Sequence, residues 1–160
     1  MDWTGWTPQE RANLCFIVAE GRVLLIHKKR GLGAGKVNAP GGRIEPGETA
    51  LEAAVRETRE EVCVTPTGIE ERGVLLFEFV DGYRLHCTVF AASGCEGEPC
   101  ETDEAVPFWA ELADIPYDAM WADDRHWLPL LIEGKRFEGR FVFDGDAMLS
   151  REVRVLTDAN

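Results

Sequence analysis

Residues 41–62, GGRIEPGETALEAAVRETREEV, carry the pattern that decides the fold. This segment contains six glutamates, in a chain of 160 residues whose formal net charge is −12. Carboxylates placed so close together repel one another, so they need either open solvent or a bound cation. The segment therefore raises a question of chemistry as well as one of folding.

A helix is predicted immediately after Thr49. Thr49 and Glu52 have the spacing of a capping box, in which each side chain accepts a hydrogen bond from a backbone N–H of the first turn. Residues 66–68, Pro-Thr-Gly, mark the region where the helix has ended. The side chains expected on its core-facing stripe follow the helical period and are Leu51, Ala54, Val55, Thr58 and Val62.

Glu57, Glu60 and Glu61 lie on one side of this helix, because each residue turns it by about 100°. A bound Mg²⁺, or alternatively Mn²⁺, would replace their repulsion with ligation by hard oxygens. Carboxylates, a divalent ion and a phosphate together indicate phosphoryl chemistry, in which the metal neutralises charge and activates water. The plainer interpretation is a solvated acidic face relieved by Arg56 and Arg59.

The wider spacing resembles the Nudix box of the Nudix hydrolases. It runs from Gly42 to Val64 and places Gly, Glu, Arg-Glu and Glu-Glu at set distances. Two positions depart from the family pattern: Thr58 replaces an aliphatic residue and Cys63 replaces a glycine. We expect the Thr58 hydroxyl to bond back to a helix carbonyl and Cys63 to adopt a negative φ. Neither departure removes a carboxylate, so activity is expected to survive.

This resemblance implies a fold and a set of roles. The fold is α+β, a Nudix-type α/β/α sandwich with a mixed β-sheet. Arg56 would orient Glu57 through a charge-assisted hydrogen bond, and Glu48 would brace the junction between loop and helix. Glu104, in ETDEAVPFW, would supply a later base or metal contact, and its alternative is an ordinary exposed loop acid. The metal-binding roles fall on Gly41, through its carbonyl, and on Glu57, Glu60 and Glu61.

The rest of the chain predicts a mixture of strands and short helices within one domain, 1–160, with residues 1–12 as an N-terminal extension. Glycine-rich or polar residues at 28–42 and 93–106 predict loops. A helix is expected through 127–132, with Asp123 or Asp124 as its cap. The expected hairpins and strand follow apolar runs separated by turn signals: 14–19 with 22–27, 74–80 with 83–92, 106–112, and 140–143 with 154–156.

A second resemblance is more specific and covers about residues 14–143. The stretches VLLIHKKRGLGAGKVNAPGG, VLLFEFVDG and DAMWADDRHWLPLL together resemble the eukaryotic MutT-homologue oxidised-purine nucleoside triphosphatases. Pro40 and Ala122 depart from that pattern, at positions where the family has an aromatic residue and a proline. The substrate-binding residues that the resemblance implies are Asn13, Lys28, Asn38, Phe77, Trp121, Asp123 and Asp124, with Trp127 and Phe143 as weaker candidates.

The neighbouring acids Asp123 and Asp124 offer a way to read the edge of a purine. An ionised carboxyl accepts hydrogen bonds and a protonated one also donates. Burial next to a second acid favours protonation of one member of the pair. Phe77 and Trp121 would supply apolar walls for stacking. The alternatives are that the acids only cap a helix and that the aromatic side chains belong to the core.

Composition limits the other possibilities. No run approaches the roughly 18 apolar residues of a membrane span, and the N-terminus MDWTGWTPQER lacks the features of a secretory signal, so the cytoplasm is expected. Five cysteines without C-x-x-C spacing indicate reduced thiols, with pairing of Cys95 and Cys100 under oxidation as the alternative. The acidic charge argues against polymeric nucleic acid as a partner and leaves room for a small nucleotide bridged by a cation.

The sequence thus predicts Mg²⁺-dependent hydrolysis of oxidised purine nucleoside triphosphates, such as 8-oxo-dGTP or 2-hydroxy-dATP, to the monophosphate and pyrophosphate. Such an enzyme would cleanse the nucleotide pool. The nearest alternative keeps the chemistry but changes the substrate to an unmodified dNTP, ADP-ribose or a dinucleoside polyphosphate. A non-catalytic nucleotide sensor is a further alternative, disfavoured because the carboxylates and Arg56 are intact.

Overall fold

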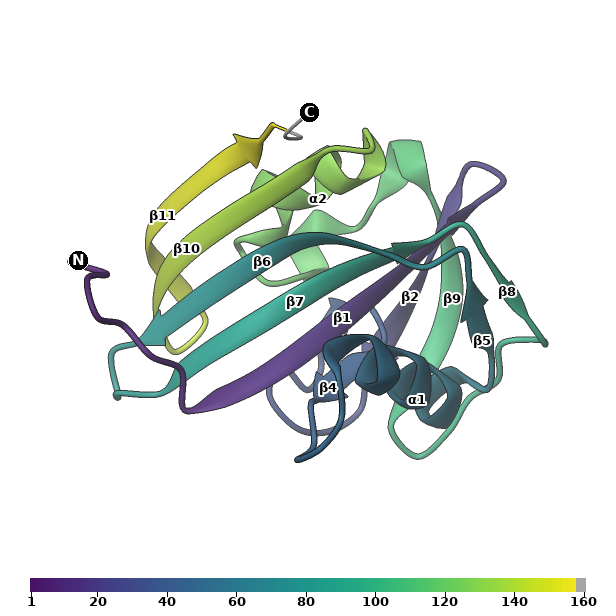
Figure 1. The fold of residues 1–160 in the computed structure, drawn as a ribbon. Coiled ribbons are helices and arrows are strands. Elements are labelled where there is room, and N and C mark those ends of the chain that lie inside the picture. The colour runs from purple at the N-terminus through teal and green to yellow at the C-terminus, as the bar shows by residue number, and fades with distance from the viewer. Residues whose placement is uncertain (158–160) are drawn as a thin grey trace.

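A computed structural model describes residues 1–157 and shows a mixed β-sheet with helices packed against it (Figure 1). The helices are α1 (Ala50–Val62) and α2 (Asp124–Ile132), and two short 3₁₀ turns cover 112–114 and 117–119. The strands are β1 (Glu10–Ala19), β2 (Arg22–Lys28), β3 (Val37–Asn38), β4 (Gly41–Arg43), β5 (Thr65–Thr67), β6 (Glu70–Phe79), β7 (Arg84–Ala92), β8 (Gly94–Glu96), β9 (Ala105–Glu111), β10 (Arg136–Asp144) and β11 (Ala147–Leu156).

The sheet has the order β11-β10-β6-β7-β1-β2-β3, with β4 also paired to β1 and β9 to β2. Two neighbouring pairs are parallel, β1 with β7 and β6 with β10, and the other pairs are antiparallel. The first half of β1 pairs with β4 and its end pairs with β2, so the sheet divides at β1. This is the mixed sheet that the sequence predicted.

Alternate residues of the central strands face two separate cores. In β1, Phe16 belongs to the core shared with α2, whereas Cys15 and Ile17 belong to the core shared with α1. This alternation follows from the two-residue period of a strand. The two helices therefore cover opposite faces of the sheet (Figure 1), which confirms the predicted α/β/α sandwich.

The predicted hairpins are present, and the segments between them hold more structure than expected. The turn at residues 80–83 joins β6 to β7, and Asp81 accepts the Tyr83 N–H there. β10 and β11 form a longer hairpin than predicted, with Asp144 paired to Ala147. The expectation of plain loop at 28–42 and 93–106 was wrong in part, because β3, β4 and β8 form there. These strands have only two or three residues, too few for a hydrophobic period to reveal them.

Helix α1 begins as predicted and buries Ala54, Thr58 and Val62 of the predicted stripe, but not Leu51 or all of Val55. Thr49 accepts from the Glu52 N–H at 3.0 Å, and Glu52 accepts from the Thr49 N–H at 3.0 Å, which confirms the capping box. Leu51 was predicted in the core and is 45% exposed. Ala53 and Glu61 are buried although the predicted stripe did not include them. The buried residues are Ala53, Ala54, Thr58, Glu61 and Val62.

Two expectations at the end of α1 were wrong. Cys63 has φ 70°, the left-handed conformation, instead of a negative φ, and its N–H donates to the Arg59 carbonyl. Cys63 also forms a disulfide with Cys100. The expectation of five reduced thiols and the alternative pairing of Cys95 with Cys100 were therefore both wrong, because the fold brings Cys63 and not Cys95 to Cys100. Cys15, Cys87 and Cys95 are free. The Thr58 hydroxyl donates to the Ala54 carbonyl at 2.7 Å, as expected from its place on the buried face.

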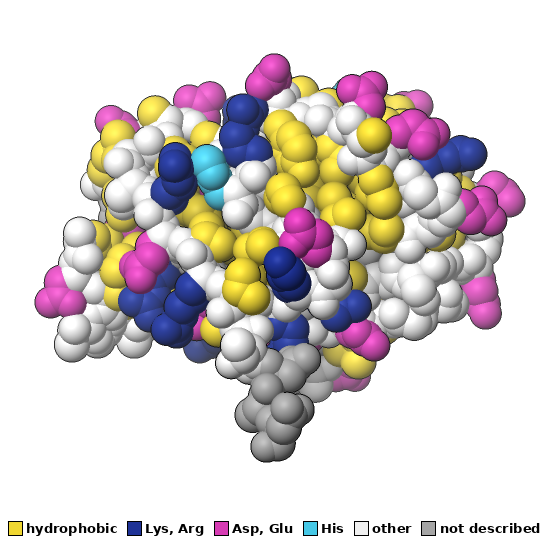
Figure 2. Space-filling view, turned by 90° about the horizontal axis from the view of Figure 1, so that it is seen from above, with side chains coloured by type: hydrophobic (Ala, Val, Ile, Leu, Met, Phe, Trp, Pro, Cys, Tyr) yellow, Lys and Arg dark blue, Asp and Glu magenta, His cyan; other side chains and the backbone are white. Residues whose placement is uncertain are grey.

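Charged side chains lie mainly at the surface. On the face shown in Figure 2, acidic and basic side chains are interspersed around hydrophobic ones. Ion pairs such as Arg125–Asp118 at 2.7 Å and Arg154–Glu138 at 3.1 Å are largely exposed. Exposed pairs contribute at most about 1 kcal/mol each, so the two cores supply most of the stability. Within residues 1–157, no helix has the length and apolar character needed to cross a membrane.

Candidate active site

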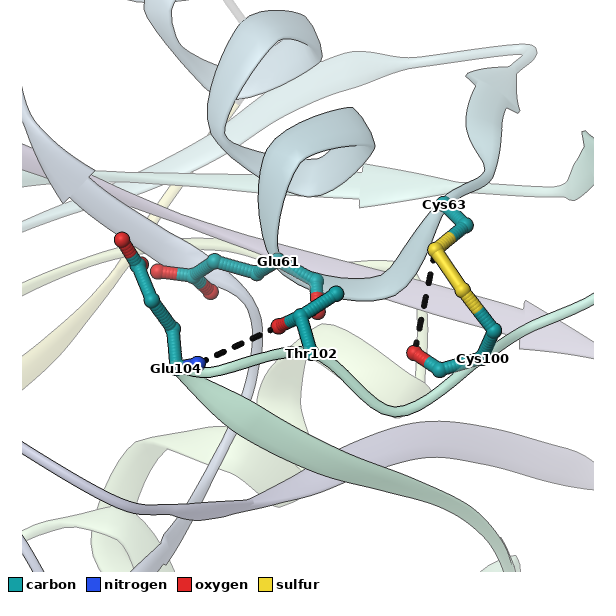
Figure 3. Close-up of a disulfide and its surroundings, with 5 residues drawn as sticks. All are labelled: Glu61, Cys63, Cys100, Thr102 and Glu104. Atoms are coloured by element: carbon teal, nitrogen blue, oxygen red, sulfur yellow. Dashed lines mark hydrogen bonds between the residues drawn. A yellow bond between two sulfur atoms is a disulfide. The ribbon is translucent and has the colours of Figure 1, made fainter.

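Three carboxylates come together where α1 faces the loop before β9. Glu57 and Glu61 extend from α1, and Glu104 comes from that loop, with one oxygen of each lying within 4.8 Å of the others. Figure 3 shows the carboxylates of Glu61 and Glu104 side by side. A donor set made only of carboxylate oxygens fits a hard divalent cation such as Mg²⁺. The structure thus brings Glu104 into the predicted cluster.

Glu60 lies outside this group. Its side chain is 53% exposed and accepts from Arg56 Nη1 at 3.2 Å, one helical turn back. The helical spacing that placed Glu60 beside Glu57 holds, but Glu61 is on the buried face of α1 and Glu60 is on the solvent side. Angles around a helix alone do not show which acid the neighbouring loop will meet.

Arg56 holds two glutamates in place. Its Nε and Nη2 donate to the two oxygens of Glu48 at 2.7 and 2.9 Å, a fork that matches the carboxylate. Its Nη1 donates to Glu57 Oε1 at 2.9 Å. The bonds from Arg56 lower the pKa of Glu48 to about 2. Burial raises the pKa of Glu57, and the bond from Arg56 opposes that rise. This arrangement has the geometry that the predicted orienting role requires.

Glu61 is the buried member of the cluster, at 4% exposure. Burial raises the pKa of its carboxyl to about 8, although the Gly41 N–H donates to it at 3.1 Å and favours the charged form. The nearby Glu57 and Glu104 raise the pKa further. A carboxylate in this position gains from a neighbouring cation, because the cation offsets both burial and like charge.

The glycines of β4 leave room for these acids. A Cβ on Gly42 would lie 2.7 Å from the carboxyl carbon of Glu57, and a Cβ on Gly41 would collide with the Asn13 carbonyl. A side chain at 41 would thus meet fixed backbone, and one at 42 would push Glu57 from its position. Gly41 and Gly42 also line a cavity of about 280 Å³. The strand therefore contacts both the carboxylate cluster and this cavity.

All seven residues predicted to bind substrate line this cavity. They come from β1, β2, β3, β6 and the segment that leads into α2. Asn13 is only 1% exposed, and neither atom of its amide has a hydrogen-bond partner. Asn38 Oδ1 accepts from the Ala39 N–H at 2.9 Å, which fixes the orientation of its side chain. The seven lining residues are Asn13, Lys28, Asn38, Phe77, Trp121, Asp123 and Asp124.

Asp123 and Asp124 lie at the floor of the cavity, 1% and 3% exposed. Burial raises the pKa of both carboxyls, and the charge of Asp123 raises the pKa of Asp124 further. Trp127 Nε1 donates to Asp123 Oδ2 at 2.8 Å and stabilises its charged form. Asp123 occupies the N-cap position of α2, yet its side chain makes no capping bond. One oxygen of each acid has no partner, so the pair has capacity left for a ligand.

The aromatic walls are supported from behind. Phe77 stacks on Phe141, with ring centres 5.5 Å apart, and Trp121 meets the edge of Phe143 at 5.5 Å. Phe143 does not line the cavity itself. Lys36 Nζ lies 5.2 Å from the centre of the Trp121 ring. A Cβ on Gly33 would lie 2.6 Å from Trp121 Nε1, so the glycine-rich loop packs closely on that ring.

Sequence reasoning missed several lining residues. Leu75 and Phe79 flank Phe77 at two-residue spacing on β6, and Leu85 and Cys87 have the same spacing on β7. The period of a strand could have found them once Phe77 was placed. Thr102 was also missed. Its Oγ1 donates to the Glu61 carbonyl at 2.7 Å and accepts from the Glu104 N–H at 3.2 Å.

Comparisons with known proteins agree with this geometry. The family model of the NUDIX domain matches residues 8–131. The oxidized purine nucleoside triphosphate hydrolase of Danio rerio is 46% identical over 91% of this chain and 94% of its own length. The protein of the same name from Mus musculus is 40% identical over 88% and 92%. A MutT protein of Bacillus halodurans superposes with a TM-score of 0.81 at 28% identity, covering 90% of this chain and 97% of its own.

Proposed function

Because the chain belongs to the NUDIX family, we propose that it hydrolyses oxidised purine nucleoside triphosphates, such as 8-oxo-dGTP and 2-hydroxy-dATP. Water adds across a phosphoanhydride bond, so one triphosphate and one water give a monophosphate and pyrophosphate. The names of the zebrafish and mouse relatives support this substrate class. The observation that carries the proposal is that β4 lines the cavity of about 280 Å³ and also contacts the cluster of three carboxylates, through Gly41 with Glu61 and Gly42 with Glu57.

The carboxylate cluster is proposed to hold Mg²⁺ beside the phosphates. Glu57, Glu61 and Glu104 supply the side-chain oxygens, with the carbonyl of Gly41 as a further ligand. Glu60 would join them by releasing Arg56 and turning its side chain toward the ion. The ion, when bound, offsets phosphate charge and activates water. Arg56 fixes the direction of Glu57 through the 2.9 Å bond described above.

Lys28 is suited to the triphosphate. It lines the cavity, and its charge is close enough to Glu61 to act against the burial that raises the pKa of that acid. A cation between the base pocket and the carboxylates would offset charge that develops on the phosphates. Lys36 lies over the Trp121 ring and pairs with Asp146 at 3.4 Å, and it does not line the cavity.

The base is proposed to lie against Phe77 and Trp121, with its edge on Asp123 and Asp124. Stacking is common to all purines, so selection among them depends on the edge. A pair that shares one proton presents an acceptor and a donor side by side. Oxidation at C8 or C2 of a purine changes the donors and acceptors of the ring, and a buried group left without its partner is costly. Selectivity would therefore depend on the protonation of this pair. Such an enzyme would work on the free nucleotide pool, and we place it in the cytoplasm.

The test is a turnover assay with Mg²⁺ over a substrate panel. The panel holds 8-oxo-dGTP, 2-hydroxy-dATP, dGTP, dATP, ADP-ribose and a dinucleoside polyphosphate, with Glu57→Gln as the inactive control. The expected result is higher kcat/KM for the oxidised purines and loss of turnover in Glu57→Gln by a factor of at least 100. Equal turnover of dGTP and 8-oxo-dGTP would contradict the sanitising role but would still support the hydrolase activity. Binding of the nucleotides without any turnover would indicate a sensor.

A further inference from the structure

The disulfide between Cys63 and Cys100 joins the end of α1 to the loop before β9, and Thr102 lies between it and the carboxylates of Glu61 and Glu104 (Figure 3). The Cα atoms of the two cysteines are 5.8 Å apart, and 37 positions separate them in the sequence. Cys63 follows Glu61 by two residues at the end of α1, and Cys100 precedes Glu104 by four residues in the loop before β9. The bond therefore joins the two segments that supply the cluster. The other cysteines within residues 1–157 make no such link.

Weaker contacts join the same two segments. The Cys100 N–H donates to the Val62 carbonyl at 3.0 Å. The Thr102 hydroxyl bridges the Glu61 carbonyl and the Glu104 N–H. Each net hydrogen bond contributes only modestly, because water competes for both partners. The disulfide is the one covalent member of this set, so its state governs how firmly the loop of Glu104 is held to α1.

Both cysteines of the disulfide are at the surface of the protein. Cys63 and Cys100 are exposed, whereas Cys15 and Cys87 are buried and Cys95 is partly buried. Burial raises the pKa of the Cys15 thiol to about 12, which makes that thiol a poor nucleophile. Small thiols and disulfides can reach the exposed pair, and the buried cysteines are protected from the same reagents. Accessible disulfides are the ones that exchange readily.

We propose that Cys63 and Cys100 are a redox-controlled positioning pair that holds Glu104 against Glu57 and Glu61 when oxidised. A low-molecular-weight disulfide such as oxidised glutathione supplies the oxidising equivalents. One cysteine sulfur attacks the glutathione disulfide and releases one reduced glutathione. The second cysteine then displaces the other glutathione from the mixed disulfide. In sum, two protein thiols and one oxidised glutathione give one protein disulfide and two reduced glutathiones.

The consequence is a site that tightens under oxidising conditions. With the bond closed, the three carboxylates are held together before the cation arrives, so less ordering accompanies its binding. With the bond open, the hydrogen bonds of Cys100 and Thr102 still join the loop to α1, and bonds from Lys29 and Arg30 still hold it to the segment after β2. The covalent link between the loop and α1 is then lost. The usefulness of this response rests on the proposed function. Oxidants that damage purine nucleotides would then also raise the metal affinity of the enzyme that hydrolyses the damaged nucleotides.

The first test measures the bond and the cation site without any nucleotide. The wild-type protein is equilibrated with reduced or with oxidised glutathione, and its cysteines are mapped by alkylation and peptide mass spectrometry. Mn²⁺ binding is then titrated by electron paramagnetic resonance. We expect a 63–100 cross-link in oxidised glutathione and about tenfold tighter Mn²⁺ binding, at the lower end of what an outer-shell support contributes to metal affinity.

Three variants separate the pair from the rest of the molecule. Cys63→Gly suits the left-handed φ of 70° while it removes the sulfur, and Cys100→Ser removes the partner. Both should lose the response of Mn²⁺ affinity to glutathione. Cys95→Ser is the matched control, since Cys95 is a partly exposed cysteine outside the bond, and it should respond like the wild type.

The proposal is overturned if no 63–100 cross-link forms, if the cross-link forms with unchanged Mn²⁺ affinity, or if Cys95→Ser abolishes the response. A second readout is the dependence of turnover on Mg²⁺. Oxidation should lower the Mg²⁺ concentration for half-maximal rate about tenfold, with less than a twofold change in kcat at saturating Mg²⁺. Equal turnover of oxidised and unmodified purine nucleotides would contradict the sanitising role but not the redox control. Cross-linking and Mn²⁺ binding are measured without a nucleotide.

Discussion

At the scale of single residues, the same kind of side chain behaves differently according to its surroundings. Glu48 and Glu61 are both glutamates of the segment 41–62, yet Arg56 lowers the pKa of Glu48 to about 2 and burial raises that of Glu61 to about 8. The first is suited to bracing the loop and the second to meeting a cation. The roles of acidic residues therefore follow from burial and partners more than from spacing.

Asp123 should decide which purine is preferred. Asp123→Asn removes an acceptor from the cavity floor but leaves α1 and the loop of Glu104 untouched. We expect kcat/KM for 8-oxo-dGTP to fall by about 10- to 100-fold relative to dGTP, the range for a hydrogen bond left unmatched at about 1–3 kcal/mol. Mn²⁺ affinity should change less than twofold. Steady-state kinetics over the purine panel measures the ranking, and an unchanged ranking would contradict the proposed pocket.

Asp124 should make the free protein less stable as the pH rises. Burial raises its pKa in the folded protein, so the folded state holds a proton that the unfolded state has lost above about pH 4. Stability from this group is therefore highest at low pH and falls as the pH rises toward the folded pKa, by about 1 kcal/mol per pH unit. Asp124→Asn imitates the protonated acid and should remove this slope.

The measurement is urea unfolding of wild type and Asp124→Asn at pH 5, 6, 7 and 8 without nucleotide. Titrating groups away from the pair, including Glu61, are common to both proteins and cancel in the difference. Asp123 is coupled to Asp124, so the change in its own titration is part of the measured effect. Parallel stability curves for the two proteins would show that Asp124 is charged in the fold across this range.

Stretches that lie far apart in the sequence supplied residues that the fold brings together: Asn13, Phe77 and Asp123 line the same cavity. Their roles in binding stay predictions. Thr102 could not be found in this way. Its role depends on the Glu61 carbonyl and the Glu104 N–H being brought within hydrogen-bond distance, and only the folded chain shows that meeting.

At the scale of elements, α1 is the part of the fold that the sequence defines best. The capping box that encloses its first turn is encoded by two residues three apart, and both of its bonds are present at 3.0 Å. The side of the helix that faces the sheet was less well defined. Leu51 fits the apolar period yet is exposed, whereas Ala53 and Glu61 are buried.

Thr49 should contribute measurably to the stability of α1. Thr49→Ala removes the acceptor for the Glu52 N–H and should lower the free energy of unfolding by about 1 kcal/mol. Thr49→Ser keeps the hydroxyl and should cost less than half as much. Denaturant unfolding of the three proteins at one pH checks the prediction, and equal losses in the two variants would mean that the cap bond itself adds nothing.

Short strands were the elements that the sequence left unseen. β4 contains only Gly41, Gly42 and Arg43, and glycine carries no hydrophobic signal. Its pairing comes from β1, whose Asn13 lies opposite Gly42. The strand exists because its partner is already fixed in the sheet, and such long-range pairing is absent from any local pattern.

At the scale of the whole molecule, the disulfide should stabilise the fold as well as the site. The cross-link closes a loop of about 37 residues, and restricting such a loop in the unfolded chain is worth about 2–4 kcal/mol. Reduction should therefore lower Tm by about 10 °C in a protein of this size. Thermal unfolding with and without a reductant measures the shift.

The stability prediction has its own control. Cys95→Ser should show the same drop on reduction as wild type, whereas Cys100→Ser should show none. A wild-type Tm that does not respond to complete reduction would mean that the native hydrogen bonds around 100 and 102 already restrain the loop.

The architecture followed from the sequence because helices and hairpins alternate with clear periods. The odd number of cysteines, by contrast, favoured free thiols. A count of cysteines does not show which two the fold brings together, here with their Cα atoms 5.8 Å apart. Cys63 and Cys100 are paired by the docking of a loop on a helix end. That event belongs to the tertiary structure, so spacing in the sequence gave no sign of it.

Strand β10 lies between β6 and β11 and runs parallel to β6. It carries Phe141 and Phe143, which back the two aromatic walls, yet it lies beyond residues 8–131 that match the family. The side chains that support Phe77 and Trp121 from behind thus lie outside the part of the chain that carries the carboxylate cluster. Exchanging the final hairpin among relatives would therefore change the packing behind these two rings while α1 and its glutamates stay the same.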